Sequence, residues 1–346
     1  MTLIIKAEDL RGLISPMEAI DAVEEAFRAL PQAPGFAATH TRLHADGRRA
    51  TIHPGGSFAH QMVGSFLHYE RLDFGSTAQR YDRVGRRLYA GYNSESAELS
   101  IVILGSLPLF AFDPPQPFGT ETAITSAVGT RLLARRDSTQ LAVLGTGRQA
   151  ARHVAVMAEL YPLADVRVFS RTEENRRGFC ERMRQFFSPR FHAVSHVDEA
   201  VQGADIVICA TSSNVPVLDG SKLSPGAHVT SIVNGNKIAV QAGEPLRYRR
   251  ELDDETVRRA ALFCVVFKEQ GMKDGQGDLV EPVEKGLITW DDLINLDEIL
   301  SGQKRGRADS NQITVFKQNS DQGVGFMALA RLAFEKARAN GIGSEM

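Results

Sequence analysis

The stretch LAVLGTGRQAARHVAVMAEL, residues 141–160, constrains the fold more than any other part of the sequence. An apolar run ends at Gly145, a second glycine follows at Gly147, and helical periodicity then begins. A strand that turns into a helix through Gly-x-Gly-x-x-Ala is the local pattern of a dinucleotide-binding sheet. Gly145 permits the tight turn, and Gly147 lets backbone N–H groups approach a pyrophosphate at the helix N-terminus.

Apolar runs recur along residues 139–267 and alternate with helical stretches. They are QLAVLG, DVRVFS, ADIVICAT, AHVTSIVNG and ALFCVVF. Near-continuous apolar strands separated by helices are typical of a parallel sheet whose two faces are both covered. We therefore expect an α/β fold in which a Rossmann-type, doubly wound parallel sheet occupies residues 121–314.

The flanking segments predict a second α/β (α+β) domain, formed by residues 1–120 and 315–346. The stretch SPMEAIDAVEEAFRAL begins with a Ser cap and a Pro in the first turn, which indicates a helix. The strand-like QITVFK and the helical end of the chain are expected to complete this domain. The parallel sheet would then be an insertion into it.

A hairpin signal lies in the first part of this second domain. Asp46-Gly47 joins two runs of alternating polarity, which predicts two antiparallel strands. Alternation places His40, Arg42 and His44 on one face of the first strand. The stretch RRLYAGYNSESAELSIVIL predicts a second hairpin.

Charge and cysteine usage exclude several classes of partner. Lys and Arg total 40 and Asp and Glu total 42, so no overall field attracts nucleic acid or an anionic membrane. The longest apolar run, residues 99–112, is too short to cross a bilayer and contains a proline. Three separated cysteines without a CxxC pair, and an N-terminus without an export signal, favour a reducing cytoplasm.

The residues after the second strand of the sheet indicate which nicotinamide cofactor to expect. An enzyme that selects NAD usually places a carboxylate there for the ribose 2′-hydroxyl. Here the residues are Ser170, Arg171 and Thr172, and the first carboxylate, Glu173, already lies in the helix. Arg171 can pair with a 2′-phosphate, so we predict NADP(H), with NAD(H) as the alternative. A solvated arginine at a helix start is the other interpretation.

Other predicted cofactor contacts lie at the glycine turn and at the end of the strand ADIVICAT. Thr211 and Ser212 either touch the ribose or nicotinamide or only form a turn. The predicted set is Gly145, Thr146, Gly147, Arg148, Gln149, Ala210, Thr211 and Ser212.

Several segments together resemble the ornithine cyclodeaminase/mu-crystallin family: LAVLGTGRQAARHV, ADIVICATSSNVPVL, PGAHVTSIVNGNK, RRELDDE and KRGRADSNQITVFKQNSDQGVG. The resemblance implies a Rossmann domain inserted into a substrate and dimerisation domain, usually in a homodimer. Members of the family move hydride between a nicotinamide and the α-carbon of an amino acid or imine. Some are cyclodeaminases that regenerate the cofactor, and others are imine reductases or amino-acid dehydrogenases. NADP(H)-using members resemble this chain in carrying a polar-Arg-Thr triplet after the second strand, which is SRT here.

The substrate half departs from the pattern that the resemblance implies. Arg42 matches the arginine that binds the substrate carboxylate, but no lysine stands near Ser65 and Phe66 where the family usually has one. Glu121 aligns with a second carboxylate-binding arginine, and Thr122 aligns with the threonine beside it. A substrate carboxylate next to Glu121 would be repelled. Glu121 can instead face a basic group, or it can be a helix-end carboxylate stabilised by the helix dipole.

The acid–base residues are less clear than the cofactor residues. The catalytic aspartate of ornithine cyclodeaminase would fall near VNGNKI, where this chain has Asn234 and Asn236. We count Asn234 and Lys317, which matches a family lysine, among the cofactor contacts, although the Lys317 segment can equally be a surface connection. His53 and His68 are candidate proton donors with Glu121. No third ligand at a suitable spacing accompanies the histidines, so we predict no metal.

These observations favour an NADP(H)-dependent oxidoreductase that acts on a C=N or CH–NH bond of an amino-acid-like substrate. Arg42 would hold an acidic group of the substrate and Glu121 a basic one. Two alternatives remain: a cyclodeaminase-type lyase with a catalytic cofactor, and a non-catalytic protein that binds NADP or a small ligand.

Overall fold

The computed structural model describes residues 2–45, 48–73, 80–82, 85–114, 117, 119–241, 247–319 and 323–346. The chain divides into two compact units. Among the described residues, the first unit comprises those up to 128 together with 323–346, and the second comprises 129–319. The second unit is therefore inserted, along the chain, between two parts of the first.

The first unit contains a mixed sheet with helices on one face. Its strand order is β16-β1-β7-β6-β4-β3-β2, and β5 pairs with β4. The β1–β7 pairing is parallel and the other pairings are antiparallel. The elements are β1 (Leu3–Lys6), α1 (Pro16–Ala29), β2 (Thr41–Ala45), β3 (Arg48–Ser57), β4 (Met62–Asp73), β5 (Arg80–Asp82), β6 (Leu88–Asn93), β7 (Leu99–Leu104), α11 (Val324–Ala339) and β16 (Ser344–Glu345).

Local signals explain several of these elements. Ser15 caps α1: its hydroxyl accepts the N–H of Glu18 at 3.2 Å, and the Glu18 carboxylate accepts the N–H of Ser15 at 2.9 Å. The predicted helix and the two predicted hairpins, β2–β3 and β6–β7, are confirmed. The turn residues Asp46 and Gly47 and the side chain of His44 lie outside the described part of the chain. Helix α11 packs against β3, β4 and β6.

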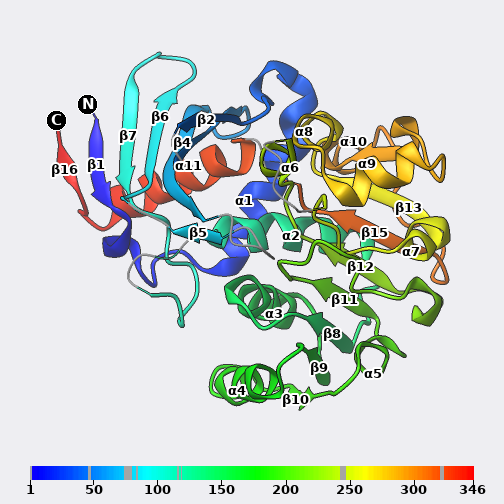
Figure 1. Cartoon of the computed structure of the whole chain (residues 1–346). Helices are drawn as coiled ribbons and strands as arrows, with labels where there is room; N and C mark the ends of the chain where they lie inside the picture. Colours follow the sequence, from blue (N-terminus) through cyan, green and yellow to red (C-terminus); the bar gives the residue numbers. More distant parts are fainter. Residues whose placement is uncertain are drawn as a thin grey trace. The chain divides into compact units, whose positions relative to one another are not determined.

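The second unit contains a parallel sheet (Figure 1). Its strand order is β10-β9-β8-β11-β12-β15-β13-β14, and every pairing is parallel. The elements are β8 (Gln140–Leu144), α3 (Arg148–Leu160), β9 (Asp165–Phe169), α4 (Glu173–Met183), β10 (Arg190–Ala193), α5 (Val197–Val201), β11 (Ile206–Cys209), β12 (His228–Ser231), α6 (Lys237–Gln241), α7 (Asp254–Arg259), β13 (Ala260–Val265), α8 (Lys268–Asp274), α9 (Gly277–Glu284), β14 (Leu293–Asn295), α10 (Leu296–Leu300) and β15 (Ile313–Lys317).

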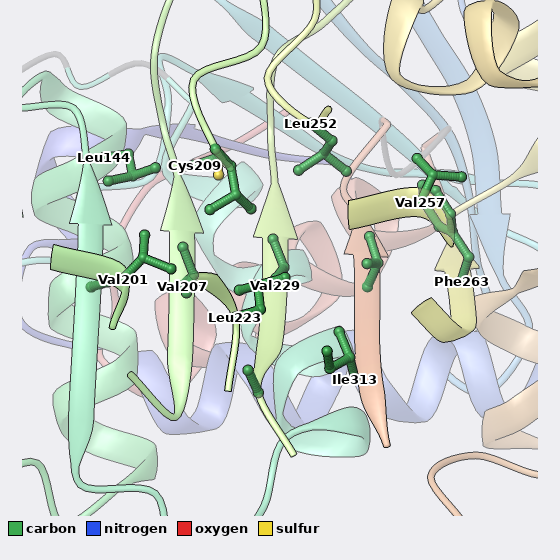
Figure 2. Close-up of a cluster of buried hydrophobic side chains, with 14 of the residues drawn as sticks. Leu144, Val201, Val207, Cys209, Leu223, Val229, Leu252, Val257, Phe263 and Ile313 are labelled. Carbon is green, nitrogen blue, oxygen red and sulfur yellow. The ribbon is translucent and has the colours of Figure 1, made fainter. Parts of the chain in front are cut away.

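Both faces of the parallel sheet are covered. On one face, alternate residues of β8, β11, β12, β13 and β15 pack against residues from α5, α7 and α9 (Figure 2). On the other face lies the end of α2 (Thr120–Leu133), where the Thr130 and Thr230 hydroxyls are 3.0 Å apart. A Cβ at Gly129 would stand 2.6 Å from the ring of Phe316, so this crossing requires glycine. The predicted fold class is confirmed.

One strand differs from expectation. The sequence pattern predicts that QITVFK belongs to the flanking domain, but β15 lies between β12 and β13 in the parallel sheet. Its five residues are all buried, as expected of an interior strand and not of an edge. Among the described residues, no helix combines the length and apolar character needed to cross a bilayer.

Candidate functional site

The turn after β8 brings three strand ends together in the second unit. Gly145 has a φ of +117°, and a Cβ there would lie 2.4 Å from the carbonyl oxygen of Ala210. The Gly145 N–H donates to the carbonyl of Phe169 at 2.9 Å, and the Ala210 N–H donates to that of Leu144 at 2.8 Å. The ends of β8, β9 and β11 therefore meet where the strand order reverses. In doubly wound sheets this is the position of the ligand crevice.

The start of α3 fits a diphosphate. Gly147 is the N-cap residue, no side chain caps the helix, and a Cβ on Gly147 would meet nothing within 4 Å. Open space beside uncapped N–H groups at a helix start suits an anion. Arg148 is exposed and Gln149 is partly buried in the same turn. The Thr146 hydroxyl lies 3.4 Å from the Ser170 hydroxyl, which joins this turn to the end of β9.

The triplet after β9 lies at the surface. Ser170 is partly buried, whereas Arg171 and Thr172 are exposed. Thr172 immediately precedes α4, and the Asn175 side chain donates to its hydroxyl at 3.1 Å. The structure thus places the Ser170 triplet and the glycine turn side by side at the carboxyl ends of β9 and β8.

A buried carboxylate, Glu251, joins the ends of β11 and β12. One of its oxygens accepts the N–H and the hydroxyl of Thr211 at 2.6 and 2.7 Å. The other accepts from the Ser231 hydroxyl at 2.9 Å and from the N–H groups of Ile232 and Val233 at 3.1 and 3.0 Å. Thr211 is therefore committed to this contact. Glu251 stands in the segment RRELDDE, whose residues alone give no signal of these contacts.

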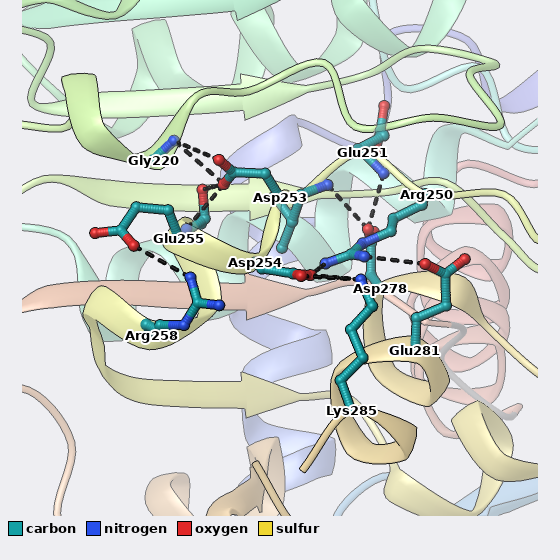
Figure 3. A network of polar contacts seen from close by, with 12 residues as sticks. Gly220, Arg250, Glu251, Asp253, Asp254, Glu255, Arg258, Asp278, Glu281 and Lys285 are labelled. Atoms are coloured by element: carbon teal, nitrogen blue, oxygen red, sulfur yellow. Dashed lines mark hydrogen bonds and ion pairs between the residues drawn. The ribbon is translucent and has the colours of Figure 1, made fainter. Parts of the chain in front are cut away.

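Asp278 and Lys317 complete this cluster, in which all three charged side chains are fully buried. The Lys317 ammonium donates to Asp278 at 2.8 Å, to the Val233 carbonyl at 2.6 Å and to the Ser231 hydroxyl at 2.9 Å. Asp278 also accepts the N–H of Glu251 at 2.8 Å (Figure 3). A cofactor contact through Lys317 would have to displace one of its three hydrogen bonds.

Burial and the positive charge of Lys317 shift the pKa of each carboxylate in opposite directions. Burial raises the pKa of Glu251 above its ordinary value. Burial also acts to raise the pKa of Asp278. The charge and hydrogen bond of Lys317, together with hydrogen bonds from the Leu252 N–H and the Ser231 hydroxyl, outweigh it, so the pKa of Asp278 is lowered. The ion pair is therefore between Lys317 and Asp278, while Glu251 serves mainly as a hydrogen-bond acceptor for backbone groups.

The two asparagines predicted near the end of β12 differ. Asn234 is exposed. Asn236 is buried, donates to the carbonyl of Arg247 and accepts the N–H of Arg249, both at 3.0 Å. Ser212, after β11, is also exposed. Asn234 and Ser212 are thus accessible at the strand ends, whereas the side chain of Asn236 is engaged by the backbone of Arg247 and Arg249.

In the first unit, the strand register places the substrate-half candidates on one sheet face. Arg42 pairs with Thr51, and Thr51 pairs with His68. The Nε2 atoms of His53 and His68 are 3.3 Å apart. The rings of His40 and His53 are 5.0 Å apart, as alternation in the first strand predicts.

Aromatic residues surround this histidine pair. Phe66 stacks on Phe326 of α11 with a centroid separation of 4.2 Å and an interplanar angle of 18°. The His53 ring packs against both of these rings, with centroid separations of 5.8 Å from Phe66 and 5.0 Å from Phe326. The pair is therefore partly enclosed by apolar surface rather than by water.

Burial lowers the pKa of His53 well below its ordinary value, and positive charge on His40, His68 and Arg42 acts in the same direction. His53 is consequently neutral near pH 7. On the same face, Arg49 Nε donates to the buried Glu70 carboxylate at 3.0 Å. Among the described residues, no three His, Cys, Asp or Glu side chains are grouped so as to hold a metal ion.

Glu121 lies in the first turn of α2, only 2% exposed. The hydroxyl of the fully buried Tyr89 donates to its carboxylate. Thr122 beside it is partly exposed. Sequence reasoning did not single out Tyr89, because only the pairing of β6 with β4 shows that it lies beside Phe66.

The chain is similar to curated reductases. It is 29% identical to a Δ1-pyrroline-2-carboxylate reductase of Bacillus cereus over 226 residues, which are 65% of this chain and 66% of that protein. It is 35% identical to the ketimine reductase mu-crystallin of Mus musculus over 196 residues, 57% of this chain and 55% of that protein. The chain thus spans just under two thirds of the first relative and about half of the second.

The fold matches a solved structure over its whole length. The Thermococcus litoralis Δ1-pyrroline-2-carboxylate reductase, in complex with NADH and L-proline, is 25% identical with a TM-score of 0.81 and full coverage of both chains. The family model of the ornithine cyclodeaminase/mu-crystallin family matches residues 119–340. The match confirms the resemblance seen in the sequence segments. Because it covers more than half of the chain, this protein belongs to the ornithine cyclodeaminase/mu-crystallin family.

Proposed function

We propose that this protein is an NADP(H)-dependent oxidoreductase that reduces a C=N bond, or oxidises the matching CH–NH bond, of an amino-acid-like substrate. The observation that carries the proposal is the glycine turn, where Gly145 can only be glycine and Gly147 faces open space. Relatives named pyrroline-2-carboxylate reductase and ketimine reductase support the imine chemistry.

In the second unit, the glycine turn would hold the pyrophosphate, and Arg171 would pair with the 2′-phosphate of NADP(H). Support for NADP(H) comes from the absence of a carboxylate among residues 170–172. The exposed Ser212 and Asn234 would contact the nicotinamide half. When bound, the nicotinamide supplies or accepts the hydride.

In the first unit, Arg42 would bind an acidic group of the substrate and Glu121 would pair with a basic one. Reduction of an imine places the hydride on carbon and requires a proton on nitrogen. Because His53 is neutral near pH 7, it can donate a hydrogen bond to that nitrogen but carries no additional proton. The proton would then come from His68, from Glu121 or from an already protonated iminium.

We also propose a homodimer that forms through the open face of the first-unit sheet. Leu43, Ala50 and Tyr69 lie side by side in register on this face, which is opposite to the one carrying His68. Leu43 is 57% exposed and Tyr69 43%. Tyr92, on the same face through its pairing with Val63, is 45% exposed. Exposed, large apolar side chains on one face of a sheet are typical of a protein interface.

A turnover assay tests the proposed function. Purified protein is mixed with NADPH and a panel of cyclic and acyclic imino acids, including Δ1-pyrroline-2-carboxylate, and absorbance of the reduced nicotinamide is followed. Net NADPH consumption is expected. Release of ammonia from an amino acid without net oxidation or reduction would show that the protein is a cyclodeaminase and not a reductase. Nucleotide binding without turnover of any substrate would favour the non-catalytic alternative.

A further inference from the structure

A second arginine, Arg176, stands at the strand end where the cofactor ribose is expected. It lies in the first turn of α4, and its backbone N–H donates to the carbonyl of Thr172 at 3.2 Å. Its Nη1 donates to the carbonyl of Ser170 at 3.2 Å. The guanidinium is thus folded back onto the residue that directly follows β9.

Two contacts link the end of β9 to the glycine turn. The Gly145 N–H donates to Phe169, the last residue of β9, and the Thr146 hydroxyl lies 3.4 Å from that of Ser170. In a doubly wound sheet, the residue that follows the second strand meets the 2′ position of the adenosine ribose. The Arg176 guanidinium therefore lies against the backbone of that residue.

The side chain of Arg176 is oriented differently from its neighbour. Arg176 is partly buried, whereas the Arg177 side chain is 69% exposed and pairs with Glu173 at 2.7 Å. That pair occupies the carboxylate nearest to the strand end. The contact with Ser170 uses one of the five N–H groups of the Arg176 guanidinium.

We infer that Arg176 is a second cation, with Arg171, for the 2′-phosphate of NADP(H), and that it is a main source of discrimination against NAD(H). The inference rests on the proposed function, because it assigns a ligand to the same nucleotide site. A phosphate monoester carries a charge of about −1.5 to −2 at neutral pH, which a single exposed arginine neutralises only in part. A second guanidinium can donate to another phosphate oxygen while it keeps its contact with Ser170.

The experiment measures nucleotide affinity rather than turnover, so that no substrate has to be known. Dissociation constants of NADPH, NADH, 2′,5′-ADP and 5′-AMP are determined by calorimetry for wild type, Arg176→Ala, Arg171→Ala and Arg177→Ala. Arg177 is the matched control, because it is the next arginine of the same helix but faces solvent. Thermal melting without nucleotide shows that each variant is folded.

The expected result is selective for ligands that carry a 2′-phosphate. Arg176→Ala should raise the dissociation constants of NADPH and 2′,5′-ADP by about tenfold or more, the size of a lost charge-assisted hydrogen bond. NADH and 5′-AMP should change little, and Arg177→Ala should affect the 2′-phosphate ligands far less than Arg176→Ala does, since it acts on them only by releasing the Glu173 carboxylate. An equal effect of Arg176→Ala on NADPH and NADH, or an effect no larger than that of Arg177→Ala, overturns the inference.

Failure of the inference is distinguishable from failure of the proposed function. If wild type binds neither NADPH nor NADH, the proposed function itself is wrong. If wild type prefers NADPH and Arg176→Ala keeps that preference, only the assignment of Arg176 is wrong.

Discussion

At the scale of single residues, the two glycines of the turn have different physical roles. Gly145 is required by the fold itself, because its φ of +117° and its approach to the Ala210 carbonyl exclude any side chain. Gly147 has ordinary extended backbone and open space around it, so the unliganded fold does not require glycine there. A requirement for glycine at Gly147 would therefore come from a ligand.

We expect Gly145→Ala and Gly147→Ala to separate these roles. Gly145→Ala should lower the melting temperature of the free protein, because the added Cβ meets a backbone carbonyl. Gly147→Ala should leave that melting temperature nearly unchanged but weaken NADPH binding, because the methyl group stands where the pyrophosphate approaches. Differential scanning calorimetry and titration calorimetry measure the two effects. Unchanged NADPH affinity in Gly147→Ala would contradict the proposed phosphate site.

At the scale of elements, a buried polar cluster joins the ends of β11, β12 and β15. Glu251 accepts hydrogen bonds from the residues after β11 and β12, and Lys317 binds the Val233 carbonyl from the end of β15. The segments after β11 and β12, which would contact the nicotinamide half of the cofactor, are therefore joined by contacts within the protein itself. Such preorganisation reduces the entropy lost on binding.

We expect Lys317→Met to destabilise the second unit by about 3–5 kcal/mol, because it leaves the Asp278 carboxylate buried without a cation. The double variant Lys317→Met/Asp278→Asn should recover part of the loss. The amide oxygen introduced by Asp278→Asn can still accept hydrogen bonds from the N–H groups of Glu251 and Leu252, but the amide carries no charge. Urea unfolding followed by fluorescence of Trp290, the single tryptophan of the sequence, reports on this unit. If Lys317→Met alone is as stable as wild type, the ion pair between Lys317 and Asp278 has no structural role.

At the scale of the whole molecule, buried neutral histidines make stability depend on pH. His228 is fully buried between the Thr314 and Thr230 hydroxyls, at 2.9 and 3.1 Å. Burial lowers its pKa to about 3, and burial lowers that of His153 to about 4. Below pH 6.5 the unfolded chain binds protons that the folded chain does not bind. The contribution of these two histidines to stability is thus fully present above that pH and is lost as the pH decreases.

We expect each of these histidines to contribute a loss of about 2 kcal/mol in the free energy of unfolding between pH 7 and pH 5. Urea unfolding followed by Trp290 fluorescence at the two pH values measures the change. The variant His228→Gln keeps polar atoms at this position but does not titrate. Its loss of unfolding free energy between pH 7 and pH 5 should therefore be smaller than that of wild type by about 2 kcal/mol. A wild-type stability that rises towards pH 5 would show that the sign is wrong.

The open sheet face of the first unit gives a prediction on assembly. Leu43→Glu should convert the proposed dimer into a monomer, because it places a charge in an apolar interface. Val215→Glu is the matched control, since Val215 is 50% exposed in the other unit. Light scattering coupled to gel filtration measures the mass. A monomeric wild type, or a dimer that survives Leu43→Glu, would rule out this interface.

Some features could be predicted because their causes are local. The cap at Ser15, the glycine turn and the apolar strands each depend on residues within one or two turns of chain. Others could not, since their partners are far apart in sequence. The position of β15 depends on which strands it pairs with, and β10 carries one buried residue among four, too few for an apolar run.

The sequence by itself determined that a parallel sheet with a tight glycine turn forms, because backbone sterics and apolar periodicity act between near neighbours. Only the tertiary structure decided that Glu251, Asp278 and Lys317 meet, and that His53 lies against His68. Buried polar groups must find partners when water is removed, and the order of the strands selects those partners. For the same reason Lys317, a cofactor candidate in the sequence, is found in a buried ion pair with Asp278.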